Sequence, residues 1–126
     1  MPKSTHGVIE IRKNPSGWWD GVVNIEAMVD QVPDVTGVLF DVDNLKGLKP
    51  IASRRGIPTD CSFMTEILER ELSATDFNMT WIRPDEIHHI FKVKNPTKGW
   101  ATIFSLMDMM EEQYGEGNVR LVAWFT

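Results

Sequence analysis

The 126-residue sequence contains one cysteine, Cys61, so no disulfide bond can form within the chain. Small secreted domains usually depend on several disulfide bonds, and a reduced cytosolic setting is therefore expected. No apolar run approaches the roughly 20 residues that a membrane-spanning helix needs. Residues 1–6 lack the apolar core of a signal peptide. These absences predict a cytoplasmic protein that has no membrane partner.

Positive charge is also scarce, because 13 Lys and Arg residues stand against 18 Asp and Glu residues, a net charge of −5. Nucleic-acid-binding domains usually present a basic surface, so we do not expect a nucleic-acid partner. A protein partner with a basic face remains compatible with this charge. The length is that of one ordinary domain, and 42% hydrophobic residues suffice for one core. We therefore predict a single domain over residues 1–126.

Motifs that bind metals or phosphates are missing as well. His88 and His89 are adjacent, and adjacent side chains on a helix diverge by about 100°, so they cannot face one metal ion. The acidic stretch that begins at Asp41 departs from the EF-hand pattern at Lys46, where that pattern needs glycine, and at Ala52, where it needs glutamate. No glycine-rich phosphate loop occurs. The sequence therefore predicts no bound metal.

The N-terminal third reads as a β-hairpin followed by an ambiguous segment. Residues 7–12 and 18–25 have strand character and flank the turn formers of residues 13–17. We expect one of the rings of Trp18 and Trp19 to pack in the core and the other to cover a sheet edge. Residues 34–42 fit both a helix with one apolar stripe and a buried strand, and periodicity alone cannot decide between them.

The rest of the chain alternates a long loop with regular elements. Glycines and prolines predict a loop over about residues 43–60. Helices are predicted over residues 63–73, 84–91 and 98–114. The first has Phe63 and Ile67 on its apolar face and Ser62 or Asp60 as its cap, and Gly115 is placed to cap the C-terminus of the last. Residues 118–125 predict a central strand. The sum is an α+β domain, a small antiparallel sheet with about four helices packed on one face.

The loop carries the most basic patch of an acidic chain, and long loops in compact domains are often functional. We therefore expect a protein-binding surface that combines the basic residues of the loop with the exposed edge around the paired tryptophans. Its predicted residues are Lys46, Lys49, Arg54, Arg55, Trp18 and Trp19.

One short string resembles a catalytic motif. Val38-Leu39-Phe40-Asp41-Val42-Asp43-Asn44 is similar to the first motif of the haloacid dehalogenase-like phosphatases, in which an apolar strand ends in Asp-x-Asp. That resemblance implies Asp41 as nucleophile, Asp43 as general acid/base and Mg²⁺ as cofactor. After residue 60 the chain has no apolar strand ending in the paired acids with which that family binds Mg²⁺. The sequence thus lacks a coherent catalytic set.

Several longer stretches resemble a family of small, uncharacterised bacteriophage proteins. They are residues 7–12, the string 38–44, the loop 50–60, Thr80-Trp81-Ile82-Arg83-Pro84-Asp85-Glu86-Ile87 and residues 118–125. The resemblance implies a viral origin and no assigned activity.

Our leading hypothesis is a non-enzymatic phage accessory protein that binds a host or viral protein in the infected cytoplasm; self-association is left open. One alternative is the phosphatase-like hydrolase that uses Asp41 and Asp43. The other is a sponge for a small nucleotide signal, with Arg54, Arg55 and a tryptophan as ligands.

Overall fold

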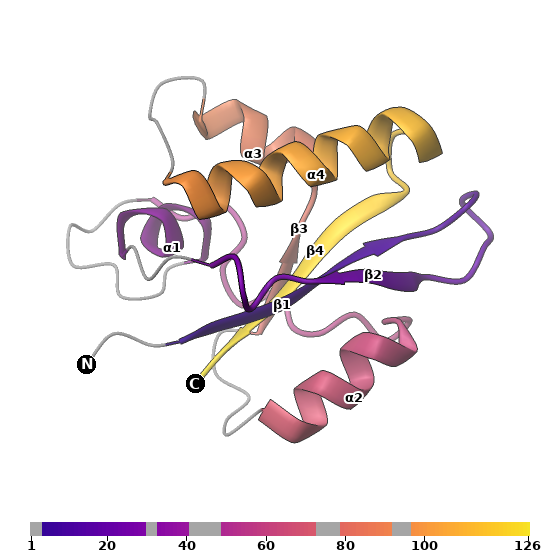
Figure 1. The fold of residues 1–126 in the computed structure, drawn as a ribbon, viewed down its shortest axis with the longest axis horizontal. Helices are drawn as coiled ribbons and strands as arrows, with labels where there is room; N and C mark the ends of the chain where they lie inside the picture. The colour runs from indigo at the N-terminus through magenta and orange to yellow at the C-terminus, as the bar shows by residue number, and fades with distance from the viewer. Residues whose placement is uncertain (1–3, 30–32, 41–48, 73–78, 92–96) are drawn as a thin grey trace.

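The computed structural model describes residues 4–29, 33–40, 49–72, 79–91 and 97–126. Its strands form one antiparallel sheet in the order β2-β1-β4-β3 (Figure 1). The strands are β1 (Thr5–Ile11), β2 (Asp20–Asn24), β3 (Thr80–Ile82) and β4 (Val119–Phe125). The helices are α1 (Pro33–Phe40), α2 (Phe63–Leu72), α3 (Pro84–Phe91) and α4 (Lys98–Tyr114). The predicted combination of a small antiparallel sheet with helices is confirmed.

Two long strands, β1 and β4, form the centre of the sheet, and every residue of both is buried. They pair over their whole length, with Val8 opposite Val122 and Ile9 opposite Leu121. The predictions of strands over residues 7–12 and 118–125, and of a central place for the second, are confirmed.

The helices cover both faces of this sheet, and Figure 1 shows α3 and α4 on one side and α2 on the other. Ile9 and Leu121 join one core cluster with residues of α4 such as Trp100. Val8 and Trp124 join a second cluster, against which side chains of α2 pack. The prediction that the helices lie on one face is wrong, because successive residues of a strand point to opposite faces and here each face of the central strands includes buried apolar side chains.

The prediction of about four helices packed on the sheet is confirmed only in part. The main contacts with strands come from α2 and α4, whereas α3 packs chiefly on α4. Within the described ranges, none of the helices is long and apolar enough to cross a membrane.

The predicted hairpin of β1 and β2 is confirmed, and it contains a bulge. Ile9 pairs with Val23 but Glu10 pairs with Gly21, so Val22 is the extra residue of β2. Gly21 lies directly against the start of α2, where a Cβ atom added to it would come within 2.6 Å of Met64 Cβ. The glycine therefore allows β2 and α2 to approach closely.

The ambiguous segment is a helix, α1, and not a strand. Leu39 and Phe40 are buried in the core, and the Phe40 ring lies 5.5 Å from that of Phe125 between centroids. The phosphatase motif needs a strand at this place, so the backbone before Asp41 differs from that of the resembled family. Asp41 and Asp43 themselves lie outside the described residues.

The three later helices are confirmed close to their predicted ranges. Gly115 ends α4 as predicted, and its N–H donates to the Glu111 carbonyl oxygen at 2.8 Å. Ser62 caps α2, because its Oγ accepts the Thr65 N–H at 3.2 Å. The described part of the long loop, residues 49–60, contains no helix or strand, as predicted. Phe63, in contrast, is not on the buried face of α2; its side chain is 76% exposed.

Candidate functional site

The turn between β1 and β2 places the two tryptophans. Asn14 Oδ1 accepts hydrogen bonds from the backbone N–H and the hydroxyl of Ser16, at 3.1 Å and 2.8 Å, which fixes the turn before Trp18. Trp18 is 91% exposed, and Trp19 is half-buried. The expectation that one ring packs in the core is wrong, because Trp19 lies among charged side chains on the α2 side of the sheet.

A buried ion pair lies beneath this surface. Glu10 is fully buried in β1, and its Oε1 accepts a hydrogen bond from Nε of Arg120, on the neighbouring strand β4, at 2.7 Å. Its Oε2 accepts the Ser62 N–H at 2.6 Å and the Thr65 hydroxyl at 2.7 Å. Since each carboxylate oxygen has a donor, the charge of Glu10 is compensated in spite of its burial. The pair thereby joins β1, β4 and the start of α2.

The network continues outward to Trp19. Arg120 Nη2 donates to Asp60 Oδ1 at 3.1 Å, and the Trp19 indole N–H donates to Asp60 Oδ2 at 3.1 Å. The guanidinium carbons of Arg120 and Arg12 lie 3.8 Å and 4.6 Å from the Trp19 ring centroid. Trp19 is therefore part of the structural network, whereas Trp18 is not held in this way.

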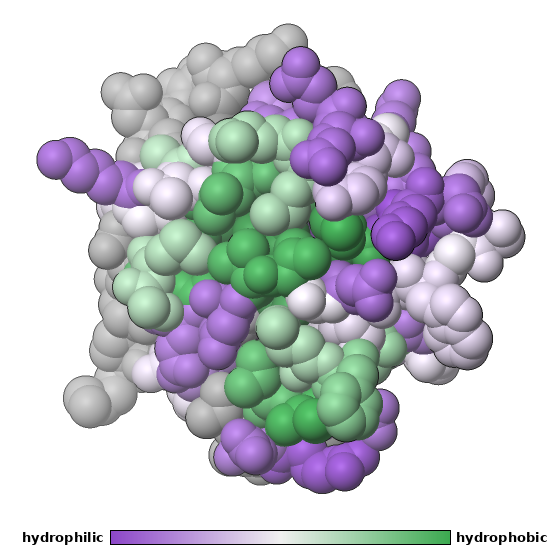
Figure 2. Space-filling model, turned by 45° about the vertical axis from the view of Figure 1, so that its right-hand side comes forward, coloured by the Kyte–Doolittle hydropathy of each residue, from purple (hydrophilic) through white to green (hydrophobic). Residues whose placement is uncertain are grey.

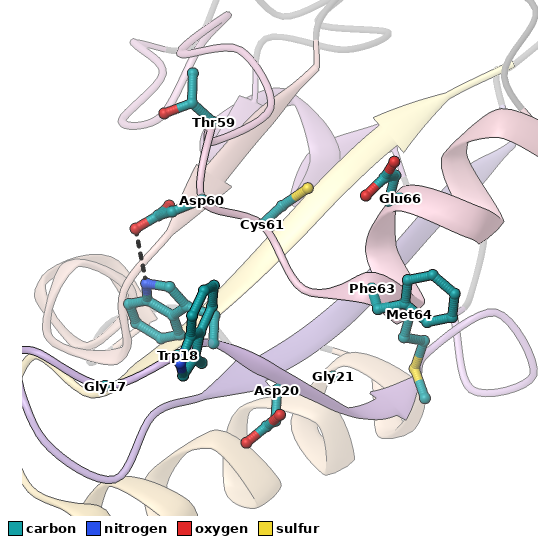
Figure 3. Close-up of a pocket in the computed structure, with 11 residues that line it drawn as sticks. Gly17, Trp18, Asp20, Gly21, Thr59, Asp60, Cys61, Phe63, Met64 and Glu66 are labelled. Atoms are coloured by element: carbon teal, nitrogen blue, oxygen red, sulfur yellow. Dashed lines mark hydrogen bonds between the residues drawn. The ribbon is translucent and has the colours of Figure 1, made fainter.

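Beside this network lies a groove of about 700 Å³, which we call the aromatic groove (Figure 3). Trp18 stands on one side of it, and Phe63 and Met64 stand on the other. Three carboxylates also line it, those of Asp20, Asp60 and Glu66. Figure 2 shows hydrophobic surface in the lower part of the drawn face, at the height of α2 in Figure 1, with hydrophilic side chains around it.

Trp18 and Phe63 are thus large apolar side chains that the fold leaves exposed to solvent. Large apolar surfaces rimmed by polar groups are typical of interaction sites. Sequence reasoning selected Trp18 but missed Phe63, which it assigned to the core because Phe63 shares a helical stripe with Ile67.

None of the predicted basic residues that the structure describes lines the aromatic groove. Lys49 and Arg54 are exposed, whereas Lys46 lies outside the described residues. Arg55 is used within the fold: its Nη1 donates to Glu86 Oε1 at 2.8 Å and to the Trp81 carbonyl oxygen at 3.2 Å. Its guanidinium carbon also lies 4.6 Å from the Trp81 ring centroid. Arg55 therefore ties the loop to β3 and α3.

This ion pair also affects the titration of Glu86. Burial opposes ionisation of Glu86, but the hydrogen bond from Arg55, the Arg83 N–H and the two positive charges outweigh it and lower the pKa of this carboxyl.

Neither a reactive thiol at Cys61 nor a metal site is supported by the part of the chain that the structure describes. Burial, together with the charges of Glu10 and Glu66, raises the pKa of the Cys61 thiol, which disfavours the reactive thiolate form. Among the residues that the structure describes, no group of three His, Cys, Asp or Glu side chains can hold a metal ion. His88 Nε2 instead lies 2.7 Å from Asp108 Oδ1 on the surface of α3 and α4.

A signal for the buried network was present in the sequence. Glu10 and Arg120 are charged residues within strands whose other side chains are mostly apolar, and a charge in a doubly buried strand needs a partner. Because the two residues are 110 positions apart in the chain, their pairing can be inferred only once β1 and β4 are known to be neighbours.

Comparison with known proteins assigns the chain to no family. No family model, curated protein or solved structure matches the chain. The resemblance to phage proteins, and the functions inferred from it, stay predictions.

Proposed function

We propose that this chain is a protein-binding module whose aromatic groove receives an extended basic segment of a partner protein. The observation that carries the proposal is the pair of exposed rings, Trp18 and Phe63, on opposite sides of one groove. Tryptophan and phenylalanine at the centre of an interface often supply much of its binding energy. The resemblance to phage proteins favours a host or viral protein as the source of the segment.

The basic character of the segment follows from the charges around the rings. Asp20 is exposed and has no ion-pair partner among the described residues. Asp60 and Glu66 add two more carboxylates, although Arg120 and Arg70 already pair with them. A Lys or Arg side chain can lie over an aromatic ring while it pairs with a carboxylate. The net charge of −5 also favours the approach of a basic partner.

The backbone of β2 argues against binding by strand addition. β2 is an edge strand of the sheet, and such edges can pair with an added strand. The bulge at Val22, however, interrupts the regular spacing of its backbone groups. Side chains in the groove, and not backbone pairing along β2, are therefore the expected basis of recognition.

The proposal can be tested by selection from a random-peptide display library. Wild-type protein is compared with Trp18→Ala, Phe63→Ala and the double variant, and Met109→Ala, an exposed apolar residue on α4, serves as the matched control. We expect peptides that carry Lys or Arg beside apolar residues, and a loss of affinity of about tenfold or more in each groove variant. Met109→Ala should bind as wild type does, and Asp20→Asn should weaken the preference for basic residues.

Two outcomes would contradict the proposal. One is the enrichment of the same peptides on the double variant and on wild type. The other is a dimer in native mass spectrometry that Trp18→Ala dissociates, because the occupant of the groove would then be a second copy of this chain.

A further inference from the structure

A second cavity, of about 260 Å³, shares Trp19 and Asp60 with the aromatic groove but has the opposite charge. We call it the arginine pocket. Its charged and aromatic lining consists of Arg12, Arg83, Arg120, Trp19, Trp81 and Asp60. Three guanidinium groups thus face one carboxylate around a single cavity, in a chain whose net charge is −5. Such a local excess of positive charge attracts anions.

Arg12 is the cation of this pocket whose charge is least compensated. Its Nε donates to Asn118 Oδ1 and its Nη2 to the Gly117 carbonyl oxygen, both at 3.0 Å. Its guanidinium also stacks on Trp19. These partners are all neutral, and no carboxylate within the described ranges forms an ion pair with Arg12. The fold therefore holds this guanidinium in one orientation without neutralising it.

Arg83 is compensated only weakly. Its Nε lies 3.5 Å from Asp85 Oδ1 and 3.6 Å from Glu86 Oε1, which are long contacts, and Glu86 is also bound by Arg55. Within the described part of the chain, Nη1 and Nη2 of Arg83 form no ion pair. The side chain is about half exposed, so it can move toward a ligand.

Arg120 has a different role in the same pocket. Glu10 and Asp60 pair with it, and it is mostly buried. Arg120 therefore shapes the wall of the pocket, while Arg12 and Arg83 offer the available donors.

The size and the donors together indicate the ligand. The planar fork of a guanidinium matches the oxygens of a phosphate group and can bind two of them at once. A cavity of about 260 Å³ is smaller than the roughly 300–1,000 Å³ that enclose most small molecules, so it fits one anionic group and leaves the remainder of the ligand outside. We propose that the arginine pocket binds the phosphate group of a small phosphorylated molecule through Arg12 and Arg83. This site does not depend on peptide binding in the aromatic groove.

The test follows the indole N–H signals in nuclear magnetic resonance spectra of the ¹⁵N-labelled full chain. The probes are inorganic phosphate and adenosine monophosphate, and sodium chloride at equal ionic strength is the reference. The signals of Trp19 and Trp81 are assigned with Trp→Phe variants, and the buried Trp124 reports on the integrity of the fold.

We expect both probes to shift the Trp19 and Trp81 signals in a saturable manner while that of Trp124 stays in place. Arg83→Gln and Arg12→Gln should each weaken binding by about tenfold or more, since each removes a charge-assisted contact. Arg70→Gln, an exposed arginine on α2, is the matched control and should bind as wild type does. Tighter binding of the nucleotide than of phosphate would show that the ligand extends beyond its phosphate, and equal binding would show recognition of the phosphate alone.

The proposal is overturned if phosphate shifts these signals no more than chloride does. It is also overturned if Arg83→Gln, which removes a half-exposed side chain with only two long ion contacts, binds phosphate as tightly as wild type. Neither result would affect the peptide selection described above, so the two proposals fail separately.

Discussion

Glu10 and Arg120 show how single residues set the geometry of this surface. They face each other across β1 and β4, and their ion pair orients Asp60, which in turn holds the Trp19 indole. A carboxylate with no solvent contact is stable only while its donors are present. The position of the groove wall therefore depends on one buried charge.

The first prediction concerns this ion pair. Arg120→Met removes the main countercharge of Glu10, and we expect it to lower the free energy of unfolding by about 3–5 kcal/mol. Adding Glu10→Gln should recover part of this loss, because the buried side chain is then neutral. Urea denaturation measures both changes. Arg70→Met, which breaks the exposed pair with Glu66, should cost no more than about 1 kcal/mol; an equally small effect of Arg120→Met would contradict the prediction.

The second prediction concerns Glu86 and pH. Its pKa is lower in the folded chain than in the unfolded one, so the unfolded state binds the proton more readily. The resulting stability is present above the ordinary pKa of a glutamate, near 4.5, and is lost as the pH falls through the lowered pKa.

We therefore expect wild type to be more stable than Glu86→Gln at neutral pH, and the difference between them to shrink on acidification below about pH 4.5. Denaturation curves of the two proteins across this range measure the difference. A difference that stays constant or grows toward low pH would show that Arg55 does not stabilise the ionised form.

At the level of elements, the contact between β2 and α2 decides where the exposed rings lie. Trp18 precedes β2, and Phe63 is the first residue of α2. Gly21 sets the distance between the two elements, because its backbone packs against Met64 and Ser62. The aromatic groove is therefore a property of how two elements dock and not of either one alone.

The third prediction follows from this contact. Gly21→Ala adds a methyl group that would lie 2.6 Å from Met64 Cβ and 3.0 Å from Ser62 Oγ, so α2 must shift. We expect a loss of about 1–3 kcal/mol in the free energy of unfolding and weaker binding of groove-selected peptides. Denaturation and peptide titration measure the two effects. Val22→Ala, at the exposed bulge residue next to it, should change stability by only about 0.5 kcal/mol; an equal effect of both substitutions would contradict the role of Gly21.

At the scale of the whole molecule, one sheet carries two different faces. The α4 face is an apolar core that continues through Trp100, Phe104 and α1. The α2 face combines a smaller apolar cluster with the charged network and both cavities. The aromatic groove, which is lined by carboxylates, and the arginine pocket meet at Trp19 and Asp60. The net charge of the chain does not reveal that two regions of opposite charge lie side by side. Function is therefore expected on the α2 face.

The sequence by itself determined most of the regular elements. The strands over residues 7–12 and 118–125 and the helices near residues 63–73, 84–91 and 98–114 follow from hydrophobic periodicity, caps and breakers, which act between near neighbours. The same local signals predicted the hairpin, and Ser62 and Gly115 at helix ends.

Only the tertiary structure decided the rest. Periodicity left residues 34–42 open between helix and strand, and the core contacts of Leu39 and Phe40 belong to the helix α1. Phe63 and one tryptophan ring were wrongly expected in the core, because burial depends on which surfaces meet, and local patterns do not contain that information. The Glu10–Arg120 pair and both cavities arise where residues far apart in the chain are brought together, so they exist only once β1 and β4 have paired and α2 has docked on the sheet.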